Sequence, residues 1–104
     1  MRLLPADELM DGKPHRAKLN DRDIVLVRHQ STTYALLDSC AHLGGPLSKG
    51  SVDDCSITCP WHGSRFSLKD GRVLDGPATL NQPTFETRIS EGYVEVRAFS
   101  PEAP

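Results

Sequence analysis

The sequence predicts an antiparallel all-β domain, and three observations support this fold class. Short runs of apolar and β-branched residues recur along the chain, and they alternate with polar residues at the period of strands. Turn-forming pairs separate these runs, namely Asn20-Asp21, Asp70-Gly71 and Glu91-Gly92. Helical patterns are almost missing, because only residues 5–10 could form a short helical turn.

Four strands are expected between residues 15 and 58. Residues 15–19 alternate and residues 23–28 are β-branched and apolar, so these two segments should form a hairpin. Residues 32–38 follow as a third strand, which leads the chain into a cysteine. Residues 54–58 alternate again and lead the chain into a second cysteine. Both cysteine regions are therefore expected directly after strands.

The carboxyl-terminal half should form two more hairpins. Residues 65–68 and 72–74 flank a Lys-Asp-Gly turn, in which Asp-Gly is a strong hairpin signal. Residues 85–89 and 93–97 are joined through a Glu-Gly pair. Residues 100–104 have the composition of a frayed tail. No internal repeat divides the chain, so we expect a single domain over residues 1–104.

Length and charge exclude several functions. The 104 residues suffice for one core. The net charge is -2, with 12 basic and 14 acidic residues, so nothing favours nucleic acid or an anionic membrane as a partner. The apolar run in residues 1–5 is too short for a signal peptide, and no stretch has the length of a membrane helix. Three cysteines, an odd number, favour a reducing compartment, so we expect a cytoplasmic protein.

Two clusters of metal-ligating residues stand out. Cys40-x-His42 and Cys59-x-x-His62 each pair one thiol with one imidazole, and 16 residues separate them. A thiolate and an imidazole so close in sequence reach one centre only if the backbone turns sharply, and glycines and prolines surround both clusters. Two facing loops would present two sulfurs and two nitrogens. That donor set suits zinc, or iron in an iron–sulfur cluster.

The order of the ligands distinguishes these metals. Mixed zinc sites usually keep cysteines together in one knuckle and histidines together in the other. Here each loop carries one of each, as a Rieske [2Fe-2S] centre requires, in which two cysteines hold one iron and two histidines the other. The pattern Cys-x-His-(16)-Cys-x-x-His, with Leu43-Gly44 and Ser64 beside it, resembles the Rieske family. Zinc remains the alternative.

The resemblance implies a cofactor and an architecture. One [2Fe-2S] cluster per chain would be held by Cys40, His42, Cys59 and His62. A small cluster-binding subdomain, about residues 39–66, would be inserted in an antiparallel β framework. Two thiolates, two sulfides and two ferric ions carry no net charge, so histidine ligation raises the reduction potential above that of all-cysteine clusters. The electron would enter and leave at the imidazoles.

The residues around the ligands suggest how the potential is tuned. High-potential Rieske proteins tie their two loops with a disulfide, and here those positions look like Gly45 and Trp61, so the tie is absent. Ser64 matches a serine that donates a hydrogen bond to a cluster sulfur, whereas Phe66 stands where such proteins have a tyrosine. We therefore expect a potential in the lower part of the Rieske range of roughly -150 to +300 mV.

One further segment and two further residues have predicted roles. Gly76-Pro77-Ala78 resembles the proline-containing loop that covers the cluster, and the alternative is a plain connection between strands. Trp61 either offers an apolar face to a redox partner or packs the two loops together. Cys55 is interpreted as a structural, half-buried thiol.

The expected function is one-electron transfer by a small ferredoxin, from a reductase to a terminal oxygenase or similar oxidoreductase. No open iron triad, nucleotide-binding glycine motif or nucleophile–base pair is evident, so no catalytic residue is assigned. A second hypothesis is an electron-transfer subunit or domain of a larger oxidoreductase, such as an oxygenase or a nitrite-reductase small subunit. A zinc-stabilised binding module is the third.

Overall fold

The computed structural model describes residues 2–19, 21–39, 45–61, 63–76 and 81–97. It confirms the antiparallel all-β fold class. Within the described residues, helical structure is limited to two short 3-10 turns, η1 (Ala6–Glu8) and η2 (Leu47–Lys49). No helix in this part of the chain is long and apolar enough to cross a membrane.

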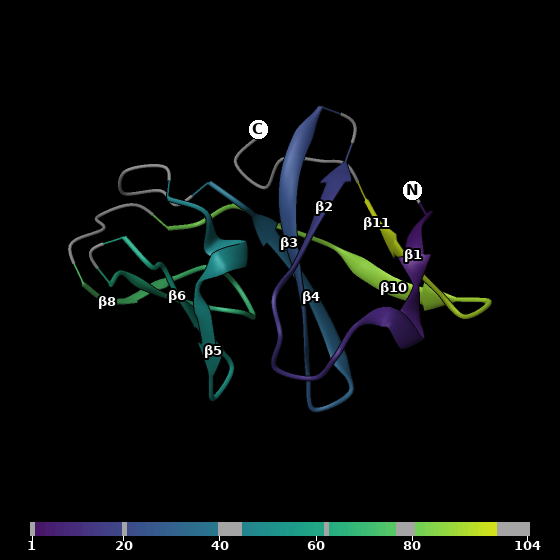
Figure 1. Ribbon diagram of the computed structural model, residues 1–104, viewed down its shortest axis with the longest axis horizontal. Coiled ribbons are helices and arrows are strands. Elements are labelled where there is room, and N and C mark those ends of the chain that lie inside the picture. The colour runs from purple at the N-terminus through teal and green to yellow at the C-terminus, as the bar shows by residue number, and fades with distance from the viewer. Residues whose placement is uncertain (1, 20, 40–44, 62, 77–80, 98–104) are drawn as a thin grey trace.

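The strands form three antiparallel sheets (Figure 1). The first has the order β1 (Arg2–Pro5), β11 (Tyr93–Val96), β10 (Thr87–Ser90). The second has the order β2 (His15–Leu19), β3 (Arg22–His29), β4 (Thr32–Leu37), β9 (Thr84–Phe85). The third has the order β5 (Ser51–Asp53), β6 (Ser56–Thr58), β7 (Arg65–Ser67), β8 (Val73–Asp75). We call the first two sheets the framework and residues 39–76, which contain the third sheet, the lobe.

Strand β3 links the framework to the lobe because both of its faces are buried. Ile24 and Leu26 belong to a framework core, whose members are Leu4, Leu9, Leu19, Ile24, Leu26, Ala35, Phe85, Val94 and Val96. Val25 and Val27, on the other face, belong to a lobe core, whose members are Val25, Val27, Leu36, Leu47, Ile57, Cys59, Phe66 and Leu68. The middle sheet is thus an apolar layer shared by two cores. Each fully buried aliphatic side chain contributes about 1.5–3 kcal/mol.

Two expected hairpins are confirmed, and the structure defines their registers. Strand β2 pairs with β3, with Ala17 opposite Ile24. Strand β10 pairs with β11, with Ser90 opposite Tyr93. The connecting Glu91 and Gly92 have φ values of 52° and 79°, the left-handed conformation that a two-residue hairpin turn requires. The β7–β8 hairpin also forms, with Phe66 opposite Val73.

Several strand predictions need correction. Residues 85–89 are not one strand, because the chain leaves the sheet at Glu86, and β9 and β10 pair in different sheets. The strand expected over residues 54–58 begins at Ser56; Asp54 (φ 48°) and Cys55 (φ 57°) form the turn from β5 to β6. Strands β1 and β5 and the turn η2 were not anticipated. The predicted tail and Asn20 lie outside the described residues.

Candidate metal centre

The structure describes the supports of the two ligand loops more fully than the ligands. Cys59 is described, as are the neighbouring residues Trp61, Ser64 and Phe66. The other predicted site residues, namely Cys40, His42, Leu43, Gly44, His62 and Pro77, lie outside the described residues. The location of the site is therefore given by the strands that precede and follow each loop.

The first loop leaves strand β4 and returns at η2. Ser39 and Pro46 form an antiparallel bridge, which brings the two ends of the loop together. Next to it, the Leu47 amide donates a hydrogen bond of 2.8 Å to the Asp38 carbonyl. These two adjacent backbone contacts close the base of the loop. The residue that follows the bridge, Leu47, is buried in the lobe core.

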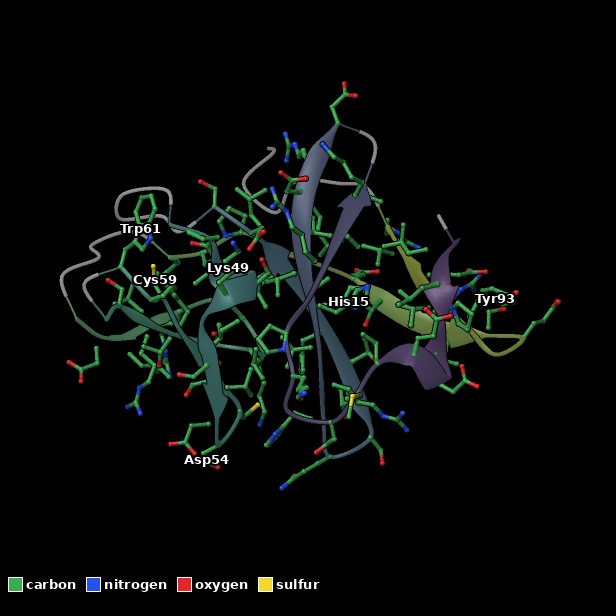
Figure 2. All side chains as sticks on the ribbon, in the orientation of Figure 1. His15, Lys49, Asp54, Cys59, Trp61 and Tyr93 are labelled. Carbon is green, nitrogen blue, oxygen red and sulfur yellow. The ribbon has the colours of Figure 1, made fainter. Side chains whose placement is uncertain are left out.

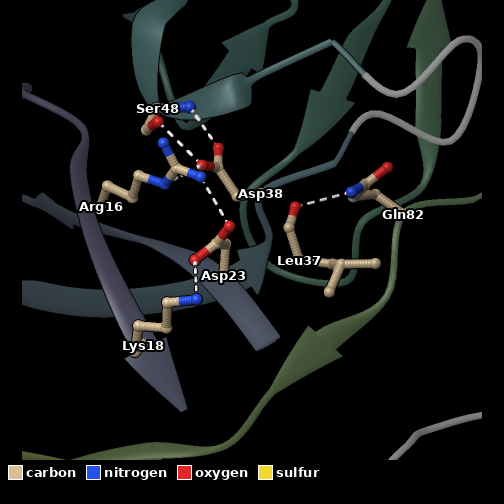
Figure 3. Close-up of polar contacts among 7 residues, drawn as sticks. All are labelled: Arg16, Lys18, Asp23, Leu37, Asp38, Ser48 and Gln82. Atoms are coloured by element: carbon tan, nitrogen blue, oxygen red, sulfur yellow. Dashed lines mark hydrogen bonds and ion pairs between the residues drawn. The ribbon is translucent and has the colours of Figure 1, made fainter. Parts of the chain in front are cut away.

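A buried carboxylate reinforces this stem. Asp38 is only 3% exposed, and its carboxylate accepts hydrogen bonds from the Ser48 amide at 2.6 Å and the Ser48 hydroxyl at 2.9 Å (Figure 3). Arg16 on β2 lies 3.3 Å from the same carboxylate and also pairs with Asp23 at 2.5 Å. The hydrogen bond from Arg16, and another from Lys18, hold the pKa of Asp23 below its ordinary value. Partners therefore compensate the buried charge and fasten the stem to the framework.

The second loop is the connection between β6 and β7. Thr58 faces Arg65 as the last residue pair of the two strands. Beyond it, the Cys59 amide donates to the Ser64 carbonyl at 2.8 Å, which closes the loop. Gly63 has a φ of 78°, in the left-handed region that favours glycine, so the glycine predicted to supply a turn does so.

The two loops meet at Gly45. A Cβ atom on this residue would lie 2.9 Å from the Cys59 sulfur and 2.9 Å from two atoms of the Trp61 ring. The first loop therefore approaches the second so closely that only glycine fits. Trp61 thus lies against the first loop, and it is nevertheless 50% exposed, so both roles considered for it stay predictions.

The sulfur of Cys59 is suited to ligate a metal. It is part of the lobe core, the residue is only 2% exposed, and the Trp61 amide donates to it at 3.4 Å. A backbone donor stabilises negative charge on sulfur and orients the side chain. Cys55, by contrast, is half-buried in its turn and donates to the Tyr34 hydroxyl at 3.9 Å, as a structural thiol would. Burial is the main cause that raises the pKa of Tyr34.

Ser64 and Phe66 are both fully buried beside the second loop. Phe66 lies between Ile57 on β6 and Val73 on β8, in the same core as Cys59. The position at which the sequence predicted a missing tyrosine hydroxyl is thus inside the lobe core, and the predicted serine donor lies at the base of the loop.

The ends of the predicted covering loop are anchored to both ligand loops. Gly76 has a φ of 93°, and a Cβ atom on it would lie 2.6 Å from the Ser64 Cα atom, so this end rests against the second loop. At the other end, Gln82 is 2% exposed, and its amide nitrogen donates to the carbonyls of Leu37 and Ser39, both at 2.7 Å (Figure 3 shows the first). Residues 77–80 between them lie outside the described residues.

Three supporting residues were missed by sequence reasoning, namely Asp38, Ser48 and Gln82. Asp38 had a usable signal, because it is a carboxylate at the end of an apolar strand just before Cys40. Ser48 and Gln82 had none, because their partners lie 10 or more residues away along the chain.

An all-β domain that brings two loops together, whose sequences each carry one cysteine and one histidine, has the architecture of a metalloprotein whose centre is shared by two loops. The sequence matches the Rieske [2Fe-2S] domain over residues 1–86. The chain belongs to the Rieske [2Fe-2S] domain family, whose cofactor is a [2Fe-2S] cluster.

Known relatives include both small ferredoxins and larger proteins. The chain is 29% identical to ferredoxin CarAc of Metapseudomonas resinovorans, over 92% of this chain and 91% of the relative. It is 32% identical to apoptosis-inducing factor 3 of Homo sapiens over 88% of this chain, but it spans only 15% of the length of that protein. Among solved structures, a chain of the complex of reduced oxygenase and oxidized ferredoxin in carbazole 1,9a-dioxygenase superposes with a TM-score of 0.87 at 28% identity, covering 93% of this chain and 100% of that one.

The described residues fit the cofactor of the family. A buried thiol with a backbone donor, beside a glycine that leaves no room for a side chain, is an environment in which a sulfur ligand is desolvated and oriented. A bound [2Fe-2S] cluster supplies reversible one-electron chemistry. The chain's own contribution is to hold the ligand loops, to exclude water from Cys59 and to place a donor at its sulfur.

Proposed function

We propose that this chain is a one-electron carrier, a Rieske-type ferredoxin that accepts an electron from a reductase and passes it to a terminal oxygenase or similar oxidoreductase. The observation that carries this proposal is the match to whole ferredoxins: the alignment spans 91% of ferredoxin CarAc. It also spans 86% of the 3-phenylpropionate/cinnamic acid dioxygenase ferredoxin subunit of Photorhabdus laumondii, at 29% identity. The match to this chain therefore covers most of the length of both ferredoxins.

The proposed ligands are Cys40 and Cys59 on one iron and His42 and His62 on the other. The desolvated sulfur of Cys59 and its contact with the Gly45 backbone support the thiolate side of this assignment. The proposed organisation is a single domain, residues 1–104, with the cluster-binding subdomain at about residues 39–66. The sheet that carries the second loop continues beyond this range, to Asp75.

The imidazoles of His42 and His62 are the proposed entry and exit point of the electron. Trp61 supports this assignment, because half of its surface is exposed next to the second loop. Partners bind such a surface briefly, since a carrier must release each partner to meet the next. A cytoplasmic location is part of the proposal and rests on the reducing conditions that a chain with free thiols such as Cys55 favours.

A second candidate is an electron-transfer part of a larger oxidoreductase. The chain is 35% identical over 63 residues to the oxygenase component of 3-ketosteroid-9-alpha-monooxygenase of Rhodococcus rhodochrous, and these residues make up 17% of that protein. Purification from the native source discriminates the candidates. A carrier elutes from gel filtration as a small protein, whereas a subunit elutes with its larger partner.

Paired cysteine variants test the cofactor. Cys59→Ser should lose the red-brown colour, the acid-labile sulfide and the paramagnetic resonance signal of the reduced protein. Cys55→Ser should keep all three, because Cys55 lies at the turn between β5 and β6. If the wild-type protein is colourless and contains zinc but no labile sulfide, the chain is a zinc-stabilised binding module and not an electron carrier.

A further inference from the structure

A polar pocket lies on the lobe, away from the loop that carries Trp61. Its volume is about 330 Å³, and its polar lining consists of Asp54, Ser56, Arg65, Ser67, Lys69 and Arg72. Figure 2 labels Asp54 at the end of the lobe opposite to Trp61, so at least this wall is remote from the proposed electron entry point. Nothing in the proposed electron transfer uses these residues.

The strand pattern explains why the pocket is polar. Side chains alternate along β7, so Phe66 enters the lobe core while Arg65 and Ser67 project from the opposite face. On the neighbouring strand β6, Ser56 is the direct partner of Ser67 and extends the same polar face. The pocket is therefore the outer face of a sheet whose inner face is apolar.

The turn from β7 to β8 holds two further cations at the rim. The Lys69 amide donates to the Ser67 hydroxyl oxygen at 3.2 Å, and the Ser67 amide donates to the Arg72 carbonyl at 2.9 Å. The Arg72 amide in turn donates to the Asp70 carboxylate at 3.0 Å. These contacts fix the backbone at Lys69 and Arg72, while both side chains remain exposed.

Among the described residues, the three cations of the pocket have no ion-pair partner. The ion pairs of the described residues involve Arg16, Lys18, Arg88 and Arg97, and none involves Arg65, Lys69 or Arg72. The Nε atom of Arg65 is buried and has no hydrogen-bond acceptor among the described residues. Asp54 is the carboxylate among the lining residues, and Asp75 lies opposite Arg65 in the pairing of β7 with β8. Although the net charge is -2, one pocket thus gathers three cations that form no ion pair with any of the described residues.

We propose that this pocket binds an oxyanion, a phosphate or carboxylate group, through Arg65, Lys69 and Arg72. A guanidinium with a buried, unpaired N–H is a strong donor to such groups, and nearby cations add attraction that survives partial screening. The ligand is either a free oxyanion or the carboxylate of an acidic segment of a protein partner. The proposal stands on the pocket alone and does not depend on the function of the cluster.

The test is a titration of the holoprotein followed by amide nuclear magnetic resonance. Inorganic phosphate is added at constant ionic strength, with sodium chloride as the reference, and an acetylated, amidated tetraglutamate peptide is titrated separately. Saturable shifts at Ser56, Ser67 and Lys69 are expected. Saturation by phosphate identifies a free oxyanion, and saturation by the peptide alone identifies a carboxylate presented by a protein segment.

Charge-removing variants locate the site. Lys69→Gln and Arg72→Gln alter exposed side chains, so both should fold, and each should weaken binding about fivefold or more. Lys49→Gln is the matched control, because it removes an exposed cation of the same lobe that does not line the pocket. The proposal is overturned if neither titrant produces shifts beyond those of chloride. It is equally overturned if Lys49→Gln weakens binding as much as the pocket variants do.

Discussion

The framework and the lobe are built from antiparallel strands but are held together by different means. Strand β3 of the framework pairs with β4 over six consecutive positions. Strands β5, β6 and β7 of the lobe have only three residues each. Short ladders supply few hydrogen bonds, so the lobe needs other contacts to fix its loops.

Those contacts are close backbone approaches and buried polar side chains. Gly45 lets the first loop lie against the side chains of Cys59 and Trp61, and Gly76 lets its segment lie against the backbone of Ser64. Asp38 and Gln82 tie the stem of the first loop to η2 and to the end of the predicted covering loop. Ion pairs of the framework, such as Arg88–Glu95, involve mostly exposed side chains. The comparison teaches that the ligand loops are fixed mainly by contacts between residues distant in sequence, whereas the framework combines local hairpins with the long-range strand pairs β1–β11 and β4–β9.

The largest effect is expected from filling a close approach in the lobe. At Gly50, a Cβ atom would lie 1.9 Å from the Thr58 carbonyl oxygen, and backbone cannot move aside easily. We expect Gly50→Ala to reduce the free energy of unfolding by about 3 kcal/mol or more and to lower iron content. Denaturant unfolding followed by circular dichroism and iron assay measure both.

The matched control lies in the framework. Gly12 has a φ of 77° but nothing within 4 Å of its Cβ position, so Gly12→Ala adds only backbone strain, about 1–2 kcal/mol. Equal losses in the two variants would show that steric closeness is not what distinguishes the lobe.

Removing the buried carboxylate should have the next largest effect. Asp38→Ala deletes two hydrogen bonds from the half-buried Ser48 and removes a buried carboxylate that Arg16 faces. Hydrogen bonds to charged groups contribute about 1.5–3 kcal/mol, so we expect a loss of this size and faster release of iron to a chelator. Asp23→Ala, which removes an exposed partner of the same Arg16, should leave the release rate unchanged. A similar acceleration in both variants would assign the effect to Arg16 alone.

A smaller effect, on the reduction potential, is expected from adding a hydroxyl group to the lobe core, with the same addition to the framework core as the control. Phe66→Tyr in the lobe core should raise the reduction potential, because a hydrogen bond to a cluster sulfur stabilises the reduced state. A bond of about 1 kcal/mol corresponds to roughly 40 mV for a one-electron couple. Phe85→Tyr in the framework core should leave the potential unchanged. Spectroelectrochemistry of both variants measures their reduction potentials. An unchanged or lower potential in Phe66→Tyr, with the cluster intact, would contradict the expected hydrogen bond to the cluster sulfur.

Hairpins of both the framework and the lobe could be predicted from the sequence. The hairpins β2–β3, β7–β8 and β10–β11 followed from alternation plus a turn signal, because both sources of information lie within a few residues. The same reasoning joined β9 to β10, since a bend at Glu86 does not interrupt the hydrophobic pattern. It also placed Cys55 in a strand, because Asp54 and Cys55 adopt left-handed turn conformations without a glycine.

For the site, the sequence predicted the loops but not their supports. Glycines, cysteines and histidines at fixed spacing indicate two sharp loops and a donor set. The contact between Gly45 and Trp61 and the two hydrogen bonds from Gln82 depend on how separate strands pack, which no local pattern encodes. The cationic pocket could not be predicted from the sequence either, because Arg65, Lys69 and Arg72 are spread over a strand and a turn.

The smallest effect is expected at the exposed ion pair that links β2 to β3. Arg16 and Lys18 lower the pKa of Asp23 in the folded protein below its ordinary value of 3.8. A lowered pKa means that the ionised group stabilises the fold at neutral pH, and that this contribution is lost as the pH falls through the folded-state pKa. Asp23→Asn should therefore be slightly less stable than the wild type near neutrality, and the difference should shrink in acid and in high salt. Urea midpoints of the two proteins at matched pH measure that difference, and a gap that persists in acid would mean that Asp23 acts through packing rather than charge.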